Sequence, residues 1–181
     1  MPNKGQVRHD HADPTDTDAV FVAFVRARGR ALARTATLLA GDPVAGEDLL
    51  QTALAQTYAR WRGNRDITDL EPYVRVVLVR AQISWRRRLS STEQPAGQWY
   101  DDESCGPDIA ERLVERGVLL EALQQLAPKQ RATLVLRYFD DLSEADTARA
   151  LGCSTGSVKQ HATRGLARLR LLLGDAVVVA P

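Results

Sequence analysis

The stretch "ARALGCSTGSVKQHATRGLARLR", residues 148–170, decides how the C-terminal third of the chain folds. It carries five basic side chains and no acidic one. Two interpretations are open: a helix pair that recognises DNA, or an amphipathic helix that closes a small bundle and exposes a charged face. Solvated helix faces usually mix both signs of charge, and residues 147–174 contain no acid at all, so the pattern favours DNA.

The order of small and apolar residues in this stretch predicts a helix-turn-helix. Ala148 is small enough for two helices to approach closely, and Gly152 tolerates the positive φ of a tight turn. Val158 anchors the second helix, and the helical period then turns Gly156 and the polar positions around it outward. The residues expected to contact DNA are Thr155, Ser157, Lys159, Gln160, His161, Thr163 and Arg164. For His161 alone, a groove-edge or packing role is favoured over a catalytic one.

Working outward, the apolar period and the capping signals predict an all-α fold with almost no strand. Helices are expected at about residues 17–40, 43–61, 70–89, 109–126, 128–139, 144–151 and 155–172. Asp42-Pro43 and the sequence Ser143-Glu144-Ala145-Asp146 are the clearest helix starts.

Residues 91–108 contain turn-forming and acidic residues, and their apolar residues show no helical spacing. This indicates a flexible acidic linker between two small helical domains, at 18–90 and 109–173. Residues 1–17 form a polar tail, predicted to be disordered, and residues 174–181 a short apolar one. About 17 flexible residues span at most ~55–60 Å, more than one DNA turn of ~34–36 Å. The two domains could therefore reach separate sites on one duplex.

Charge is distributed in blocks along the chain. The formal net charge is +4 over residues 1–90, −6 over residues 91–127 and +3 over residues 128–181. Two cationic segments joined by an anionic one favour binding to a single polyanion at two places. Cys105 and Cys153 have no partner at metal-ligand spacing, and no apolar run approaches a membrane span or a secretory signal. These features predict a cytoplasmic protein without a metal, a disulfide framework or a membrane anchor.

Longer segments carry a family resemblance. "LQQLAPKQRATLVLRYFDDLSEADTARALGCSTGSVKQHATRGLARLR" resembles region 4, the promoter-recognising domain of bacterial alternative sigma factors. "LLAGDPVAGEDLLQTALAQTYARW" resembles the polymerase-binding helix of sigma region 2, and "EPYVRVVLVRAQISWRRRLS" the helix that captures the −10 element. Both regions stand in order with an irregular connector between them. The resemblance is to the extracytoplasmic-function (ECF) group, within it the SigE-like subfamily.

The resemblance implies a set of partners and contacts. Asp48 and Gln51, its Asp-x-x-Gln signature, would bind the clamp helices of the β′ subunit of RNA polymerase core, and region 4 would dock on the β flap. The −10 element would be bound and melted by the third helix, which from residue 72 to 92 has no acid. Its basic residues expected to contact DNA are Arg75, Arg80, Arg86, Arg87 and Arg88. The acidic linker would run toward the RNA exit path, imitating nucleic acid or merely solubilising the chain. An anti-sigma factor could control the protein.

The chain departs from the family pattern at four positions. Arg80 stands where Asn is common, and Thr52 where an acid usually follows the signature. His161 replaces a common Arg and Gln160 a common Ser. Since Arg does not duplicate an amide's contacts and Gln can pair with adenine, unusual −10 and −35 preferences are expected.

The sequence thus predicts a sigma factor that directs polymerase to a small set of promoters and needs no cofactor and no catalytic residues. One rival is a free-standing helix-turn-helix regulator whose first domain dimerises or senses a signal. Another is a helical interaction or enzyme module whose C-terminal helices are only structural. Trp61, Tyr73 and Trp85 could stack on bases, but core packing is the favoured role for each.

Overall fold

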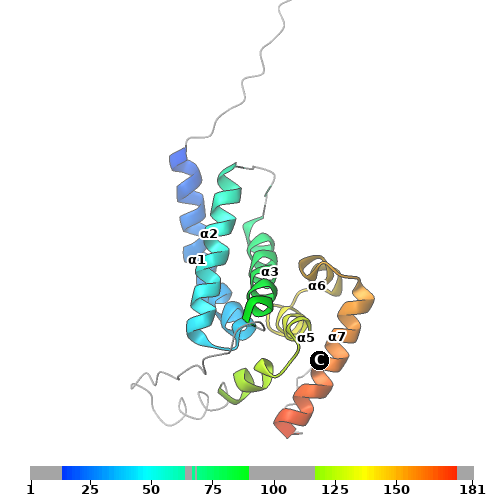
Figure 1. Cartoon of the computed structure of the whole chain (residues 1–181). Coiled ribbons are helices and arrows are strands. Elements are labelled where there is room, and N and C mark those ends of the chain that lie inside the picture. Colours follow the sequence, from blue (N-terminus) through cyan, green and yellow to red (C-terminus); the bar gives the residue numbers. More distant parts are fainter. Residues whose placement is uncertain (1–13, 64–66, 68, 90–116, 175–181) are drawn as a thin grey trace, which may run out of the picture.

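The computed structural model describes residues 14–63, 67, 69–89 and 117–174, with only the backbone described at residues 14–17, 63 and 85–89. All regular structure within these ranges is helical, as the sequence pattern predicts (Figure 1). None of the described helices is long and apolar enough to cross a membrane. The linker and both tails expected from the sequence fall mostly outside the described residues.

Three long helices, here called the N-terminal bundle, are α1 (Pro14–Ala40), α2 (Pro43–Gly63) and α3 (Leu70–Leu89). The break between α1 and α2 lies where it was predicted. Gly41 takes a φ of 82°, and the Asp42 carboxylate accepts the backbone N–H of Ala45 at 2.7 Å. Pro43 then occupies the first helical position, where a missing N–H costs nothing.

The C-terminal bundle comprises a helix at residues 117–124, α5 (Pro128–Leu134), η1 (Val135–Phe139), α6 (Glu144–Leu151) and α7 (Thr155–Leu173). The cap predicted at Ser143 is present, because its Oγ accepts the backbone N–H of Asp146 at 3.0 Å. Ser154 caps α7 in the same way, its Oγ accepting the backbone N–H of Ser157 at 3.1 Å. Between α6 and α7, Gly152 has a left-handed φ of 61°, which produces the helix-turn-helix bend.

One helix differs from its prediction. A single α-helix was expected from Pro128 to Phe139, but its last turn, η1, is wound as a π-helix. The backbone N–H of Asp140 accordingly donates to the carbonyl of Val135, five residues back, at 3.1 Å. This wider turn leaves Phe139 exposed and brings the Asp140 carboxylate to Thr35 of α1, whose hydroxyl lies 2.7 Å from it.

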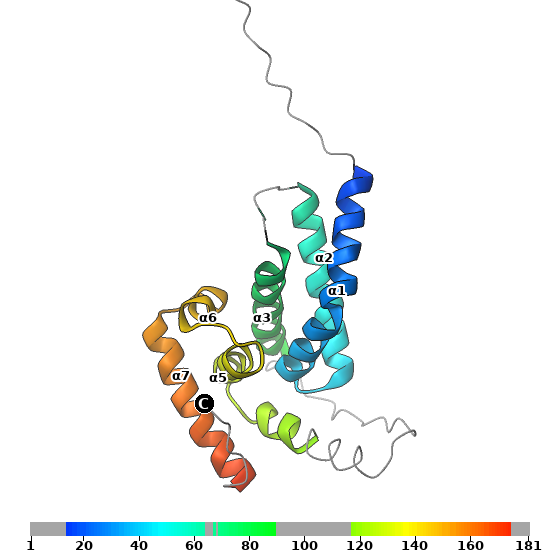
Figure 2. The ribbon, with the colours of Figure 1, turned by 180° about the vertical axis from the view of Figure 1, so that it is seen from behind.

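The two bundles pack against each other rather than standing apart. In both views, α3 lies beside the C-terminal bundle, and contacts join α3 to α5 and α6, and α1 to η1 (Figures 1 and 2). One cluster of buried side chains runs through both bundles, from Leu39 and Leu78 to Val135 and Leu151. A smaller cluster joins residues 117–124 to α5 and α7. The two bundles therefore share a core, and a second, smaller core lies within the C-terminal bundle.

Gly46 marks the closest approach of α2 to α1. A Cβ at this position would lie 2.6 Å from Thr37 Cα and 2.8 Å from its backbone nitrogen, so the backbone must move. Gly46→Ala is expected to lower the free energy of unfolding by about 1–3 kcal/mol. Gly29→Ala is the matched control, because its nearest neighbour would be a Val25 methyl at 3.8 Å. It should raise stability by about 0.5–1 kcal/mol. Urea denaturation followed by circular dichroism measures both, and equal effects would contradict the close approach.

Candidate nucleic-acid interface

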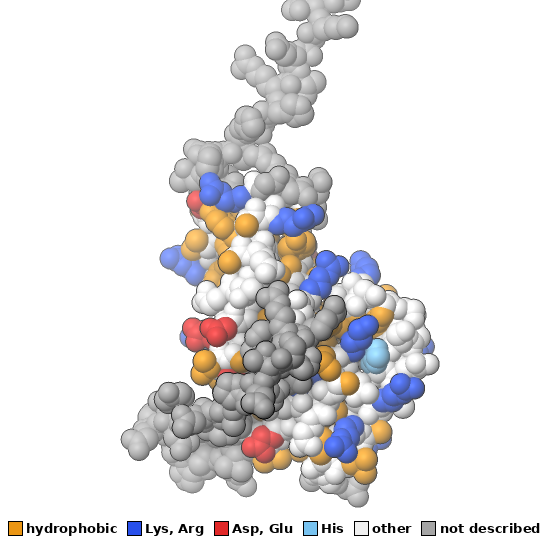
Figure 3. Space-filling view, in the orientation of Figure 1, with side chains coloured by type: hydrophobic (Ala, Val, Ile, Leu, Met, Phe, Trp, Pro, Cys, Tyr) orange, Lys and Arg blue, Asp and Glu red, His pale blue; other side chains and the backbone are white. Residues whose placement is uncertain are grey.

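The outer face of α7 has the predicted polar surface. Val158 is 1% exposed and Leu169 is buried, which fixes the rotation of the helix about its axis. Thr155, Gln160, Thr163 and Arg164 are exposed, and Ser157 is half-buried beside Ser154. Figure 3 shows basic side chains gathered around the pale-blue histidine on this side of the molecule. A helix in this position could place its N-terminal half in a major groove.

The packing of α7 on α5 makes this face rigid. Gly165 is buried, and a Cβ there would lie 3.0 Å from a methyl group of Leu134. The Leu134 side chain of α5 therefore packs directly on the backbone of α7 at Gly165. A recognition face that is backed in this way is held in a fixed register, which base-edge contacts require.

Two of the predicted DNA contacts have a particular environment. His161 is half-buried, and its pKa is lowered first by burial and then by the nearby positive charges of Lys129 and Arg164. Its imidazole is therefore neutral near pH 7, with one N–H donor and one acceptor. Lys159 forms an exposed ion pair with Glu144 of α6 at 3.5 Å. Such a pair is weak and leaves the ammonium available to a phosphate.

The predicted basic residues of α3 do not share one environment. Arg80 is exposed. The side chain of Arg75 is 14% exposed and binds two carboxylates, Glu71 at 2.7 Å and Asp140 at 3.0 Å. In this arrangement the Arg75 guanidinium is occupied by the C-terminal bundle. The side chains of Arg86, Arg87 and Arg88 lie outside the described part of the structure.

Asp48 and Gln51 are both exposed on α2, and neither side chain forms a hydrogen bond or ion pair with another described residue. A groove of about 450 Å³ between α2 and α3 is lined by Asp48, Thr52, Gln56 and Arg80. The structure thus brings together a residue predicted to bind polymerase and one predicted to bind DNA. Sequence spacing does not indicate this proximity. Among the described residues, no three His, Cys, Asp or Glu side chains gather as metal ligands would.

The aromatic residues divide between packing and open positions. The ring centroid of Phe21 lies 5.7 Å from that of Trp61 and 5.0 Å from that of Tyr58. Packing is therefore confirmed for Trp61. Tyr73 lines a cleft between the two bundles instead. The side chain of Trp85 is not described.

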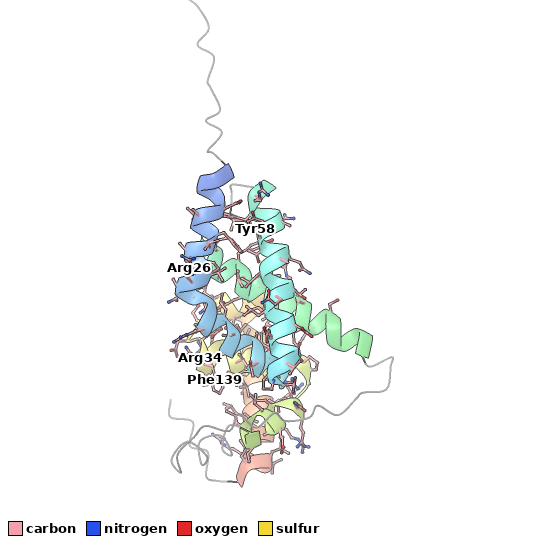
Figure 4. The ribbon with its side chains drawn as sticks, turned by 90° about the vertical axis from the view of Figure 1, so that its left-hand side faces the viewer. Arg26, Arg34, Tyr58 and Phe139 are labelled. Carbon is pink, nitrogen blue, oxygen red and sulfur yellow. The ribbon has the colours of Figure 1, made fainter. Side chains whose placement is uncertain are left out.

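The structure also shows charged residues that the sequence reasoning missed. Arg28 of α1 donates two hydrogen bonds to Glu71 of α3, at 2.5 and 2.6 Å. These bonds, ahead of the charge of Arg75, hold the pKa of Glu71 below its usual value. On the same helix Arg26, Arg30 and Arg34 are exposed; Figure 4 shows Arg26 and Arg34 on the outer side of α1, with Phe139 near the end that carries Arg34. Their four-residue spacing is the signal that could have identified this basic stripe.

Comparisons with known proteins agree with this geometry. The Sigma-70, region 4 family matches residues 116–169, the C-terminal bundle. The RNA polymerase sigma-E factor of Streptomyces coelicolor is 43% identical over 150 residues, 83% of this chain and 84% of that protein. The ECF RNA polymerase sigma factor SigM of Mycobacterium tuberculosis is 30% identical over 155 residues, 85% of this chain and 77% of that one.

Two solved structures have the same fold. The sigma factor RpoE bound to the anti-sigma factor NepR from Bartonella quintana matches with a TM-score of 0.66 at 21% identity, covering 87% of this chain and 99% of that one. CnrH in complex with the cytosolic domain of CnrY matches with a TM-score of 0.58 at 22% identity, over 88% and 91%. At these identities the likeness is one of fold.

The sequence relatives match across both bundles and not the helix-turn-helix alone, which disfavours a free-standing regulator. With the exposed, acid-free face of α7 and the all-helical architecture, they establish the family. The chain belongs to the ECF RNA polymerase sigma factors, with sigma-E factors among its relatives, and it directs polymerase core to promoters for transcription initiation.

Proposed function

We propose that the two bundles divide promoter recognition between them. Residues 18–90 act as sigma region 2, binding polymerase core and the −10 element, and residues 109–173 act as region 4, binding the −35 element. Residues 91–108 connect them. The observation that carries the proposal is the outer face of α7: exposed, without an acid, and backed by the buried Val158 and Gly165.

At the −35 element, α7 would combine base and backbone contacts. The Gln160 amide can form two hydrogen bonds with adenine, and the Arg164 guanidinium two with guanine. Thr155, Ser157, Lys159 and Thr163 supply hydroxyl groups and a charge suited to phosphates. His161, neutral at the edge of this face, could accept or donate one hydrogen bond. Since Gln160 and His161 depart from the family pattern that the resemblance implies, the preferred −35 sequence should differ as well.

At the −10 element, region 2 would capture the melted strand. Arg80 faces the groove between α2 and α3 and can hold a phosphate or a guanine edge. Asp48 lines the same groove, so polymerase bound at Asp48 would lie beside the DNA bound at Arg80. Binding a flipped base in a protein site offsets the pairing and stacking lost on melting. Arg75, Arg86, Arg87 and Arg88 would extend this contact along the backbone.

The protein would act by binding and positioning DNA, not by a covalent step, and would do so in the cytoplasm. The two solved neighbours were captured with inhibitor proteins, NepR and CnrY. By analogy, an anti-sigma factor could cover one or both bundles of this chain.

The polymerase contact is tested by charge removal on α2. Asp48→Ala should lower run-off transcription with core polymerase by about tenfold, the effect of losing roughly 1.4 kcal/mol of core binding. Genomic fragments serve as templates, and transcript 5′ ends are sequenced. Glu47→Ala is the matched control, because Glu47 is an exposed acid one residue away. Equal losses of run-off transcription in both variants would show that Asp48 does not bind polymerase.

The −35 contact is tested at two arginines of α7. The probe is a −35 duplex from a promoter that the run-off transcripts identify. Arg164→Ala should weaken binding to this duplex by about 1–3 kcal/mol and relax the base preference at one position. Arg170→Ala is the control, since Arg170 is also exposed but lies in the last turn of the helix. Fluorescence anisotropy at low ionic strength measures both. If Arg164→Ala binds as well as the parent, Arg164 does not touch the DNA.

The environment of His161 predicts a pH dependence. Burial and the charges of Lys129 and Arg164 lower its pKa in the free protein, whereas DNA phosphates favour the protonated form. Binding therefore takes up a proton, and affinity for a −35 duplex should rise as pH falls from 7.5 to 5.5. We expect a rise about two- to fivefold larger than in His161→Gln. Identical pH profiles for the two proteins would show that His161 stays unprotonated in the complex.

A further inference from the structure

The basic stripe on α1 consists of Arg26, Arg30 and Arg34, all of them exposed. From residue 19 to residue 41 the sequence has no acid at all. Among the described side chains, none forms an ion pair or a hydrogen bond with these three guanidinium groups. Arg28, by contrast, lies on the side of α1 that meets α3 and is paired with Glu71. The stripe is therefore a row of cations without a partner in the described part of the molecule.

The stripe lies on the side of α1 that faces away from the core. At about 100° per residue, Arg30 lies about 180° around the helix from Leu39, which is 0% exposed. Figure 4 shows Arg26 and Arg34 on the same outer side of the helix. The opposite face of α1 packs on α2, α3 and η1. The guanidinium groups are consequently open to solvent along the helix.

This face is distinct from the surfaces proposed for polymerase and promoter DNA. The groove that contains Asp48 and Arg80 is lined by residues of α2 and α3, and none of its lining residues comes from α1. The proposed −35 contacts lie on α7, in the other bundle. A molecule bound to the stripe would therefore leave both surfaces uncovered.

The spacing of the stripe matches an α-helix better than it matches nucleic acid. Four residues of an α-helix rise about 6 Å, so the three arginines stand on a nearly straight line about 12 Å long. Carboxylates four residues apart on a partner helix have the same rise, so all three pairs can form in register. Phosphates of one B-DNA strand rise about 3.4 Å per nucleotide and turn about the duplex axis. A straight row with longer steps does not follow them.

The residues around the arginines also favour a protein partner. Ala23 and Ala27 are exposed, so no long side chain separates the guanidinium groups, and a second helix can approach closely. Single-stranded nucleic acid is usually held by a series of aromatic rings that stack on its bases, and residues 26–34 contain none. Phe139 of η1 is a single exposed ring near one end. At the other end, Val20 and Val22 are 49% and 46% exposed and offer apolar contact to a partner.

We propose that the basic stripe of α1 is a docking site for an acidic helix of a regulatory protein, with Glu or Asp at every fourth position on one face. Each guanidinium can bind a carboxylate through two hydrogen bonds. Such a partner binds the holoenzyme without displacing polymerase or DNA; this part rests on the positions proposed for those two surfaces. Exposed ion pairs are individually weak, so binding requires all three arginines and weakens as salt is added.

The docking site is tested with two synthetic helical peptides of identical composition. In the first, glutamates stand at every fourth position and share one face; in the second, the same residues are rearranged so that the glutamates surround the helix. Anisotropy of the fluorescein-labelled peptides measures binding to the full chain at low ionic strength. The first peptide should bind about five- to fiftyfold more tightly than the second. Equal affinities would show that the stripe attracts charge without recognising a helix face, and would overturn the proposal.

A stripe variant, with all three arginines replaced by Gln, identifies the residues responsible. Its matched control removes the same charge at three arginines exposed elsewhere, by Arg60→Gln, Arg168→Gln and Arg170→Gln. The stripe variant should bind the first peptide about fivefold or more weakly than the parent, and the control should lose less than about twofold. A labelled 15-nucleotide single strand of DNA is the second probe. A larger loss of DNA binding in the stripe variant than in the control would identify a nucleic-acid site and overturn the proposal.

Binding alongside polymerase is tested with the assembled holoenzyme on a promoter duplex that the run-off transcripts identify. The affinity of the first peptide should stay within about twofold of its value for the free chain, and the stripe variant should keep the parental level of run-off transcription. Release of the peptide by core polymerase, or a loss of run-off in the stripe variant, would place the stripe in the polymerase or promoter interface and overturn the proposal. Asp48→Ala should leave peptide binding to the free chain unchanged, so a failure of the proposed polymerase contact is read separately.

Discussion

The buried guanidinium of Arg131 is the constraint on which the arrangement of the whole molecule depends. It donates to carbonyl groups at the ends of two helices, one in each bundle, and neither end has enough partners of its own. Helix C-termini carry partial negative charge, which makes a buried cation tolerable there. Gln82 of α3 donates to the same Leu39 carbonyl, so α1, α3, α5 and the helix at residues 117–124 meet at this point. The apolar contacts around it follow from that meeting.

Most of the fold could be predicted from the sequence because the helix ends are locally encoded. Asp42-Pro43, Ser143 and Gly152 each specify a cap or a turn through their own side chain or backbone freedom, and the structure confirms them. The apolar face of α7 could be predicted as well, because the helical spacing of its apolar residues can be read from the local sequence. The π-helical end of α5 could not, because no local signal marks it and the contact that it makes possible, Asp140 with Thr35, joins positions 105 residues apart.

The candidate site could be predicted in part for the same reason. Gln160, Thr163 and Arg164 are exposed on one face, as the period indicated. Charge counting treated every arginine of α3 alike, yet Arg75 is paired across the bundles and Arg80 is open. Arg131 shows the same limit: a charged residue is rarely buried, and nothing local marks it as an exception. Partners distant in sequence decide which arginines are available.

The π turn of η1 has a consequence for how this family member could change. A π turn holds one residue more than an α turn, and each residue rotates the chain by about 100°. Losing one residue between Val135 and Phe139 would restore ordinary winding and turn Asp140 away from α1, while α6 and α7 kept their own caps. The length of this turn therefore decides, in steps of one residue, whether the Asp140 carboxylate reaches Thr35 and Arg75, so a single in-frame deletion would break this contact between the bundles.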